Sequence, residues 1–440
     1  MKSEEYRRLD RETVWHPYTD YRELMSEDFP VIEAGEGIHL YDVEGKQYVD
    51  AISSWWACNL GHGQKQVVEA IKTQADELQH SILGNQSNPR AIELAQRLVE
   101  KTGGNRRAFF ASDGASAVEA ALKIALQHWH NRGDNKRRKI AYLKGDYHGD
   151  TLGAVSVGYL EGFHKPFKAV LPDQPSLPAP DCLSCEEAEV SCSLKCYDDV
   201  SALLSQEGEE LAAVVIEPLC QAAMGMNIYP ARFLRRLALQ CREKGILLID
   251  DEIAMGMGRT GKMWAYEQAD VRPDIICLGK GLTAGYLPLS ATLVDEDIYD
   301  SFKSPPPERT FFHGHTFAGN PLASAAALAT LDYYDENDLL VHVQSLAELV
   351  AEQFEQMNDV SSVKTARSLG LLGTVQFDGA SRNEAVHRAK RVKQELLRRG
   401  VLVRPLGPVV YLMPPLVIEE EQLIYLIEEF KSVIGKVGDG

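Results

Sequence analysis

The 440-residue sequence predicts an α/β protein with a mostly parallel sheet in a large domain and a smaller α+β domain beside it. Two observations support this fold class. From about Pro89 to Val294, short apolar runs alternate with stretches of helical period, as expected for buried strands joined by helical crossovers. The flanking segments lack this alternation. We therefore expect residues 81–330 to form the large domain, and residues 1–80 and 331–440 to form the small one together.

Six apolar runs are the expected strands of the large sheet. They are Ala108–Ala111, Ile140–Leu143, Ala212–Ile216, Ile246–Ile249, Ile275–Leu278 and Leu289–Val294. Helices are expected between them, for example at Ala115–His130 and Ala231–Glu243, because apolar residues recur there with a period near 3.6. The segment Leu171–Tyr197 has no such pattern and is expected to be a long irregular loop.

The flanking segments carry patterns of their own. Gly37–Ala51 alternates apolar and polar residues around Glu44-Gly45, which predicts a hairpin. Leu339–Met357 and Glu420–Ile434 have a strong helical period. Between these two expected helices, Val401–Val417 is strand-like and interrupted by proline. The small domain is therefore expected to mix helices with short strands.

Composition and charge exclude several classes of function. Hydrophobic residues make up 45% and charged residues 25%, as in an ordinary globular protein. The formal net charge of −18 would repel nucleic acid and anionic lipid, so neither is an expected partner. Every apolar run is far shorter than the roughly 18 residues of a membrane helix, and Met1–Asp10 is too charged for a secretory signal. Eight cysteines in so long a sequence favour a reduced, cytoplasmic protein.

Polar residues gather where the expected strands end, and ligands of open α/β sheets bind outside the carboxyl ends of the strands. The segments are Ser112–Ser116, Tyr147–Asp150, Glu217-Pro218, Asp250–Glu252 and Gly279–Gly281. Taken singly, each has an ordinary structural explanation as a tight turn, a helix cap or a solvated loop. Together they meet the needs of pyridoxal 5′-phosphate (PLP), which takes a lysine, an acid at its ring nitrogen, an aromatic ring and N–H donors for its phosphate.

One glycine motif imitates two nucleotide-binding sites. Gly256–Gly261 fits G-x-G-x-x-G, and with Lys262 it nearly matches the phosphate-binding P-loop. The P-loop is excluded because Met263 stands where a Ser or Thr should bind magnesium. A dinucleotide site is disfavoured because the carboxylates of Asp250–Glu252 separate the motif from its strand and would repel a pyrophosphate.

The segments Asp251-Glu252-Ile253, Gly256–Gly261 and Leu278-Gly279-Lys280 resemble the signature of class III (omega-type) aminotransferases, and the resemblance spans nearly the whole chain. Further segments resemble the branch of this class that converts 8-amino-7-oxononanoate to 7,8-diaminononanoate in biotin synthesis. They are Trp15–Tyr18, Ser53–Trp56, Tyr147–Thr151, His313–Pro321, Arg404–Gly407 and Tyr411–Pro415. The resemblance implies fold type I of the PLP-dependent transferases, with a seven-stranded sheet, and a homodimer with the active site at the subunit interface.

The resemblance also implies roles for single residues. Lys280 would bind the cofactor covalently and move the reacting proton, Asp251 would hold the protonated ring nitrogen, and Tyr147 would stack on the ring. The cofactor-binding residues would be Gly114, Ala115, Tyr147, Glu217, Asp251, Lys280 and, from the other subunit, Thr316; the substrate-binding residues would be Tyr18, Trp55, Asp150, Lys280 and Arg404. Arg404 would offer its guanidinium to a carboxylate. Without the resemblance, Trp55 could equally be a core aromatic and Arg404 half of a structural ion pair.

Several points stay open at this stage. The amino donor could be adenosylmethionine or lysine, and a broad omega-transaminase acting on diamines or ω-amino acids is the alternative function. Met255 and Met257 stand where the family usually has Thr and Phe, which leaves the shape of the pocket near the cofactor open. Cys182, Cys185, Cys192 and Cys196 have spacings that could enclose zinc or an iron–sulfur cluster, but reduced thiols without a metal are the favoured interpretation.

Overall fold

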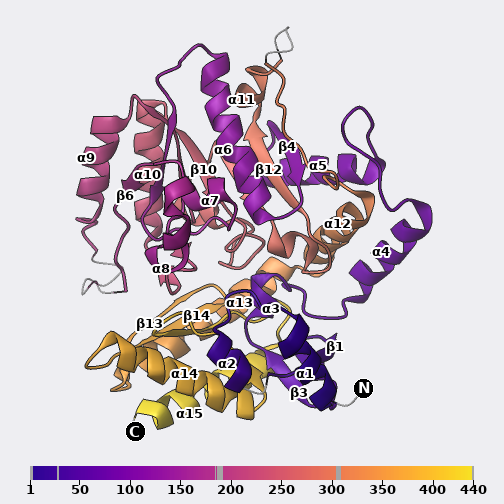
Figure 1. The fold of residues 1–440 in the computed structure, drawn as a ribbon, viewed down its shortest axis with the longest axis vertical. Coiled ribbons are helices and arrows are strands. Elements are labelled where there is room, and N and C mark those ends of the chain that lie inside the picture. Colours follow the sequence, from indigo (N-terminus) through magenta and orange to yellow (C-terminus); the bar gives the residue numbers. More distant parts are fainter. Residues whose placement is uncertain (1–2, 27–28, 184, 186–191, 304–308, 439–440) are drawn as a thin grey trace.

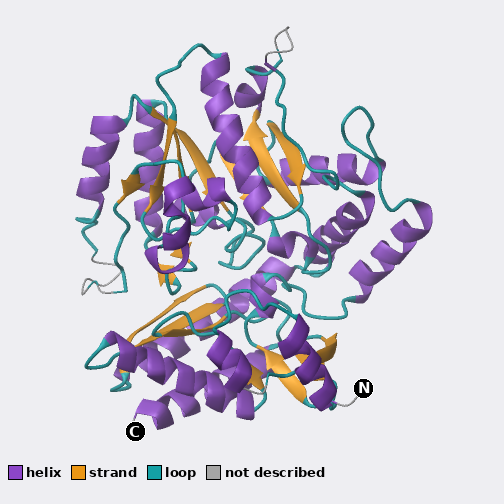
Figure 2. Cartoon of the chain, viewed as in Figure 1, coloured by secondary structure: helices purple, strands orange, loops and turns teal. Residues whose placement is uncertain are grey.

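The computed structural model describes residues 3–26, 29–183, 185, 192–303 and 309–438. Figure 1 shows two lobes, with both described ends of the chain in the lower one. The upper lobe holds a seven-stranded sheet between helices, and the lower lobe holds two smaller sheets covered by helices, as Figure 2 shows by secondary structure. Within the described residues, no helix is both long and apolar enough to cross a membrane.

The seven-stranded sheet has the order β4-β12-β11-β10-β7-β5-β6. Its strands are β4 (Arg106–Ala111), β5 (Lys139–Leu143), β6 (Ser176–Leu177), β7 (Leu211–Ile216), β10 (Leu247–Asp251), β11 (Ile275–Leu278) and β12 (Ser290–Asp295). Only β12 runs against its neighbours, β4 and β11. All six strands expected from the sequence are confirmed. The seventh, β6, lies in the segment expected to be irregular, because its two residues are too few to show a pattern.

Helices cover both faces of this sheet and pack beside it (Figure 1). The expected helices at Ala115–His130 and Ala231–Glu243 are confirmed as α6 (Gly114–Asn131) and α10 (Ala231–Lys244). The other helices of this lobe are α4 (Lys65–Glu77), α5 (Pro89–Lys101), α7 (Leu152–Ser156), α8 (Glu161–His164), α9 (Tyr197–Glu207), α11 (Glu296–Asp300) and α12 (Pro321–Glu336). Asp113 caps α6, since its carboxylate accepts from the N–H of Ser116 at 2.9 Å.

The lower lobe combines segments from both ends of the sequence. Its strands are β1 (Ile32–Glu36), β2 (His39–Asp42), β3 (Gln47–Asp50), β13 (Val363–Leu369), β14 (Leu372–Phe377), β15 (Val401–Leu402) and β16 (Val409–Leu412), and its helices are α1 (Ser3–Thr13), α2 (Tyr21–Ser26), α3 (Ser53–Trp56), α13 (Leu339–Glu355), α14 (Arg382–Arg398) and α15 (Glu420–Gly438). The expected hairpin is confirmed by the antiparallel pair β2 and β3. Because β15 pairs in parallel with β3, the two distant segments share one sheet.

The glycine motif Gly256–Gly261 joins the two lobes. Its Arg259 is 1% exposed, and burial lowers the pKa of the guanidinium to about 10. The guanidinium donates to the carbonyl oxygens of Pro414 at 2.6 Å and Leu371 at 3.3 Å, and to the hydroxyl of Ser53 at 3.3 Å. The motif therefore serves as a structural link, which agrees with the sequence argument against a nucleotide site.

Gly373 on β14 provides a test of the packing of the lower lobe. A Cβ at this position would lie 2.2 Å from ring atoms of Phe354, which is fully buried on α13. We expect Gly373→Ala to reduce the free energy of unfolding by about 1–3 kcal/mol and to lower the melting temperature. Gly435→Ala on α15 is the matched control, because a Cβ there meets nothing within 4 Å and alanine favours a helix. Equal melting temperatures for the two variants would contradict this packing.

Candidate active site

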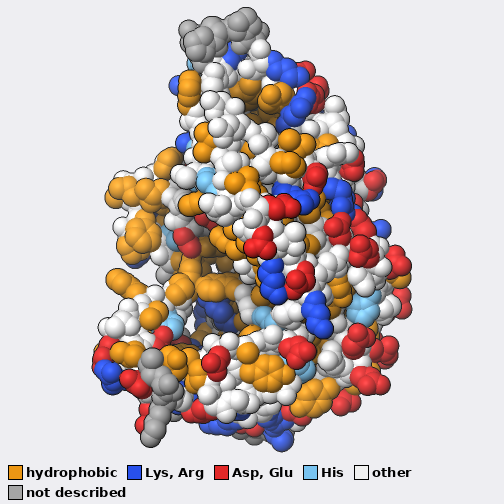
Figure 3. Space-filling model, turned by 90° about the vertical axis from the view of Figure 1, so that its right-hand side faces the viewer, with side chains coloured by type: hydrophobic (Ala, Val, Ile, Leu, Met, Phe, Trp, Pro, Cys, Tyr) orange, Lys and Arg blue, Asp and Glu red, His pale blue; other side chains and the backbone are white. Residues whose placement is uncertain are grey.

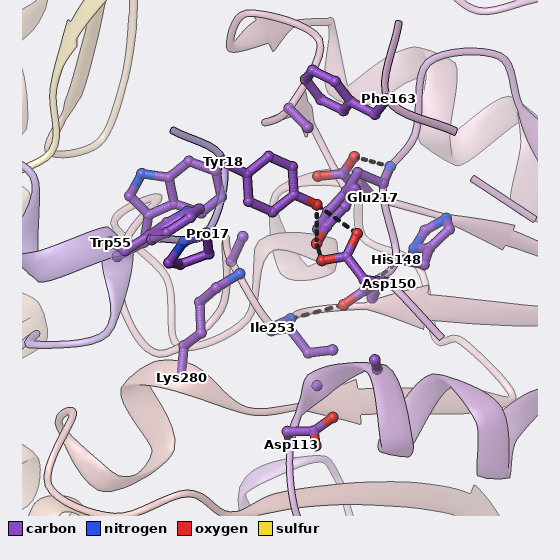
Figure 4. Close-up of a pocket in the computed structure, with 18 of the residues that line it drawn as sticks. Pro17, Tyr18, Trp55, Asp113, His148, Asp150, Phe163, Glu217, Ile253 and Lys280 are labelled. Atoms are coloured by element: carbon purple, nitrogen blue, oxygen red, sulfur yellow. Dashed lines mark hydrogen bonds and ion pairs between the residues drawn. The ribbon is translucent and has the colours of Figure 1, made fainter. Parts of the chain in front are cut away.

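A cavity of about 620 Å³ opens at the carboxyl ends of the parallel strands, where the lower lobe faces the sheet. Figure 3 shows a hollow between the lobes with apolar side chains on its rim, and Figure 4 shows the cavity from within. Every site residue expected from the sequence lines the cavity except Thr316. Thr316 is exposed on the turn before α12. The cavity lies where ligands of open α/β sheets bind.

The N-terminus of α6 lines the part of the cavity where we expect a phosphate group to bind. The carboxylate of Asp113 accepts from the N–H of Ser116, and the carbonyl oxygen of Asp113 accepts from the N–H of Ala117. The N–H groups of Gly114 and Ala115 have no acceptor among the described residues, and both residues line the cavity. Gly149 closes on this end, since a Cβ there would lie 2.4 Å from the Cβ of Ala115. Two free donors at the positive end of an 18-residue helix suit a phosphate group.

Asp251, the last residue of β10, is held by a buried histidine. The Nδ1 of His148 lies 2.7 Å from one Asp251 oxygen, and the other oxygen accepts from the N–H of Ile253 (Figure 4). On its far side, the Nε2 of His148 lies 3.7 Å from the Asp146 carboxylate. Burial disfavours a charged imidazole, but the two carboxylates outweigh it and raise the pKa of His148 to about 10. His148 therefore places a positive charge beside Asp251 at neutral pH.

Glu217, which follows β7, binds the backbone of two separate segments with its carboxylate. One oxygen accepts from the N–H of Tyr147 at 2.8 Å and the other from the N–H of Ala222 at 3.0 Å. Burial and the nearby Asp146 charge raise the pKa of Glu217 to about 8. The sequence predicted direct support of the cofactor. In the structure, Glu217 lines the cavity and also fixes Tyr147, the aromatic residue expected against the cofactor ring.

Lys280 projects into the cavity from the end of β11 (Figure 4). Its backbone has φ 39°, in the left-handed region, as the chain turns sharply after the strand. Burial lowers the pKa of its amine, and the charges of Asp251 and Glu217 only partly oppose this effect. The Nζ lies 4.8 Å from the ring centre of Trp56. A lysine with a lowered pKa is suited to nucleophilic attachment and to proton transfer.

Two tyrosines and a carboxylate form the outer wall of the cavity. The hydroxyls of Tyr18 and Tyr147 both donate to Asp150, the second at 2.7 Å, and lie 3.3 Å from each other (Figure 4). Burial and Asp150 raise the pKa of Tyr18 to about 12, and burial with both neighbours also raises the pKa of Tyr147. Both phenols therefore stay neutral and can donate hydrogen bonds.

Arg404 also lines the cavity and lies over two aromatic rings. Its guanidinium carbon is 4.2 Å from the ring centre of Trp55 and 5.9 Å from that of Tyr18. Among the described residues, no carboxylate forms an ion pair with Arg404. A guanidinium that lines a cavity without a carboxylate partner is suited to bind a ligand carboxylate. The structure therefore does not support the interpretation of Arg404 as half of a structural ion pair.

Trp55 and Trp56 stand on an unusual backbone. The residues of α3, Ser53 to Trp56, have φ values of 49°, 45°, 69° and 70°, so the segment is a left-handed turn of four non-glycine residues. Left-handed backbone costs such residues about 1–2 kcal/mol each. Strain of this kind persists only where surrounding contacts enforce it, and it concentrates at functional sites.

The sequence arguments left three contributors without a role: Asp146, His148 and Trp56. His148 was present in the motif around Tyr147, and the alternation of Asp146 with His148 could have placed both side chains on one side of an extended segment. The contact of His148 with Asp251 could not be foreseen, because it joins the loop after β5 to the end of β10, and β7 lies between these strands in the sheet. Met255 and Met257 are buried and do not line the cavity, so their substitution leaves its wall unchanged.

The four-cysteine segment lies away from this cavity. Cys182, Cys185, Cys192 and Cys196 form no disulfide among the described residues, while residues 184 and 186–191 between them lie outside the described part of the chain. In the ranges that the structure describes, no group of three or more His, Cys, Asp or Glu side chains is arranged to bind a metal.

A buried lysine, an acid and a helix N-terminus at the carboxyl edge of this sheet define a PLP-dependent transferase of fold type I. Residues 24–434 match the family model of class-III aminotransferases, and the chain belongs to that family. It is thus an aminotransferase, and enzymes of this class depend on PLP. The residues at the cavity fit that cofactor, because α6 offers two free N–H donors to a phosphate and Lys280 and Asp251 line the same space.

Several known aminotransferases are similar to this chain in sequence or in structure. An adenosylmethionine-8-amino-7-oxononanoate aminotransferase from Nitratidesulfovibrio vulgaris is 41% identical, over 97% of this chain and 81% of its own length. The crystal structure of the enzyme of this name from Methanocaldococcus jannaschii has a TM-score of 0.93 at 35% identity and covers 99% of both chains. An amine transaminase from an uncultivated Pseudomonas species, in a PLP-bound form, has a TM-score of 0.90 at 31% identity, over 97% of this chain and 99% of its own.

The pKa of His148 should lie above the ordinary value for histidine, and the pKa of His128 should lie below it. Because carboxylates flank His148 and raise its pKa to about 10, its ring should remain protonated at pH 8. His128 is buried beside Ser301 and Arg132, and burial lowers its pKa to about 4, so its ring should be neutral at pH 6. Nitrogen NMR of histidine-labelled protein, with single His→Gln variants for assignment, would measure both. A neutral His148 at pH 8 would contradict the buried ion pair.

Proposed function

We propose that this chain transfers an amino group to 8-amino-7-oxononanoate, forming 7,8-diaminononanoate for biotin synthesis, with adenosylmethionine as the amino donor and lysine as the alternative. The observation that supports this substrate most is Arg404, whose guanidinium lines the same cavity as Lys280 and pairs with no carboxylate among the described residues. A keto acid whose carboxylate binds Arg404 would direct its carbonyl carbon toward the lysine. Relatives carrying this activity in their names are 34–41% identical over 81% or more of their own length.

Different residues of the cavity would bind different parts of the cofactor. When bound, PLP supplies an aldehyde for amino-group transfer and a ring that accepts electrons. The N–H groups of Gly114 and Ala115 would hold its phosphate, Tyr147 would cover its ring, and Asp251 would bind its ring nitrogen. His148 supports Asp251 from behind with a positive charge 2.7 Å away.

Lys280 would attach the cofactor and then act as the general acid and base. Its lowered pKa increases the fraction of neutral amine, and a neutral amine is needed for both tasks. Tyr18 and Asp150 would bind the polar part of the amino donor at the outer wall. The hydroxyl of Tyr18 donates to Asp150, which leaves the other lone pairs of this carboxylate for a donor amine.

We further infer that the enzyme is a cytoplasmic homodimer. Trp15 is 97% exposed and Phe312 is 81% exposed, and such large apolar side chains in water favour burial against a second copy. Thr316 lies four residues after Phe312, so the partner subunit's Thr316 would reach the phosphate across this interface. None of the eight cysteines forms a disulfide in the described part of the chain, which agrees with a reducing compartment.

Residues 81–330 would then act as the cofactor-binding domain, and residues 1–80 with 331–440 as the domain that carries Trp55 and Arg404. The separate sheets of the two lobes support this division, although α4 precedes residue 81 and packs on α12 of the upper lobe. The division places the substrate carboxylate on one domain and the cofactor on the other.

Covalent attachment at Lys280 can be tested without turnover. Borohydride reduction of the PLP-loaded enzyme should fix the cofactor on the peptide that contains Lys280, as mass spectrometry would show. Lys280→Ala should lose this label and reduce turnover by several orders of magnitude. Lys262→Ala is the control, because this nearby lysine is absent from the cavity lining. Label on any other lysine would refute the assignment.

Asp251→Asn should retain the cofactor but slow the reaction. The amide keeps the shape of the side chain and loses the negative charge that stabilises a protonated ring nitrogen. We expect kcat to fall by roughly 10²–10⁴-fold, in the range of other charge deletions at reacting groups. Absorbance of the bound cofactor and pre-steady-state rates would measure the two effects separately. Unchanged rates would remove Asp251 from the mechanism.

The substrates themselves require a direct assay. Purified enzyme would be offered 8-amino-7-oxononanoate with adenosylmethionine, lysine or a set of diamines, and 7,8-diaminononanoate would be measured by mass spectrometry. We expect product with adenosylmethionine at the highest kcat/KM. Efficient transamination between diamines and simple keto acids, without reaction of 8-amino-7-oxononanoate, would show a broad omega-transaminase instead.

A further inference from the structure

We propose that Asp50 is a positioning residue for the substrate carboxylate, because it holds the left-handed turn that carries Trp55, the platform of Arg404. Asp50 is 1% exposed at the end of β3 and does not line the cavity. Its effect would therefore pass through the turn. The inference extends the proposed function, since it takes Arg404 as the group that binds the carboxylate.

The first step is the contact between Asp50 and the turn. One carboxylate oxygen accepts from the N–H of Ser54 at 3.0 Å, and the other accepts from the hydroxyl of Ser54 at 2.7 Å. His62 fixes the carboxylate from the other side, with its Nε2 2.9 Å from the second oxygen. Ser54 is the second of four consecutive left-handed residues, so Asp50 grips the strained backbone near its middle.

The second step joins the turn to the segment that carries Arg404. The hydroxyl of Ser53 donates to the carbonyl oxygen of Met413 at 2.7 Å, and the Nε1 of Trp56 donates to the hydroxyl of Tyr411 at 3.0 Å. Arg404 lies close enough to Tyr411 for its charge to oppose in part the burial that raises the pKa of the Tyr411 hydroxyl. These contacts join the turn to the segment from Arg404 to Met413. They require the left-handed shape of the turn, so the position of this segment depends on that shape.

The third step is the dependence of Arg404 on Trp55. The guanidinium lies 4.2 Å from the centre of the Trp55 ring, and no carboxylate of the described residues orients it. A stacked guanidinium keeps its plane parallel to the ring, which sets the direction of its N–H groups. If the turn relaxed to a right-handed backbone, Trp55 would rotate away and the N–H groups would lose that direction.

The neighbouring Asp42 provides a matched control. It is also buried, at 4% exposure, on the adjacent strand β2, and it accepts from the N–H groups of Glu44 and Lys46 and from the hydroxyl of Tyr48. It thus resembles Asp50 in burial and in hydrogen bonds but contacts no residue of the turn. Asp42→Asn should destabilise the same sheet without altering the substrate site.

The experiment compares the PLP-loaded variants Asp50→Asn and Asp42→Asn. For Asp50→Asn we expect KM for 8-amino-7-oxononanoate to rise about tenfold or more, while kcat changes less than about threefold, because binding rather than chemistry is affected. For Asp42→Asn we expect a lower melting temperature with KM within about twofold of the parent enzyme. An unchanged KM in Asp50→Asn, or an equal rise in Asp42→Asn, would overturn the proposal.

A rescue variant separates positioning from general stability. Glycine adopts left-handed backbone freely, so Ser54→Gly in the Asp50→Asn background should restore the turn. We expect this second substitution to reverse at least about a third of the increase in log KM. Failure of this variant to lower KM would also count against the proposal.

A readout without turnover keeps the two proposals distinguishable. Near-ultraviolet circular dichroism reports the surroundings of tryptophan, and it should change in Asp50→Asn but not in Asp42→Asn. If the parent enzyme fails to convert 8-amino-7-oxononanoate while this spectral difference appears, the proposed substrate is wrong and the hold of Asp50 on the turn stands. If no spectral difference appears, Asp50 does not position Trp55.

Discussion

The active site depends on a buried contact between Asp251 and His148. These residues come from strands that are separated by β7, so the contact forms only when the sheet is complete. Asp146 binds His148 from the other side, and Glu217 fixes the backbone between them at Tyr147. In a site removed from water, the carboxylates of Asp251 and Asp146 on its two sides stabilise the positive charge of His148.

The second constraint is the direction of the strands. Because all strands of the large sheet except β12 run the same way, their carboxyl ends meet at one edge. That edge brings the phosphate-sized helix terminus, the acid and the lysine to one cavity. The lower lobe closes the cavity from the opposite side with Trp55 and Arg404. The cofactor groups and the substrate groups thus come from different lobes, which Arg259 connects through buried hydrogen bonds.

Much of this arrangement could be predicted from local pattern. The six long strands are apolar over four or more residues, so periodicity located them to within two residues. The strand β6 was missed because two residues make no pattern, and it is held by pairing with β5 alone. The left-handed turn was missed for another reason, since Ser and Trp have no preference for positive φ and contacts from distant residues, Asp50, Arg259, Tyr411 and Met413, stabilise it.

The sequence by itself determined the strand ends, the helix cap at Asp113 and the chemical types of the groups that follow each strand, because these depend on residues close along the chain. Family resemblance added which of these groups belong to one site. Only the tertiary structure decided that His148 places a positive charge beside Asp251, that burial lowers the pKa of the Lys280 amine, and that Arg404 pairs with no carboxylate in the described ranges. Burial and the pairing of charges arise between distant segments, so no stretch of sequence contains them.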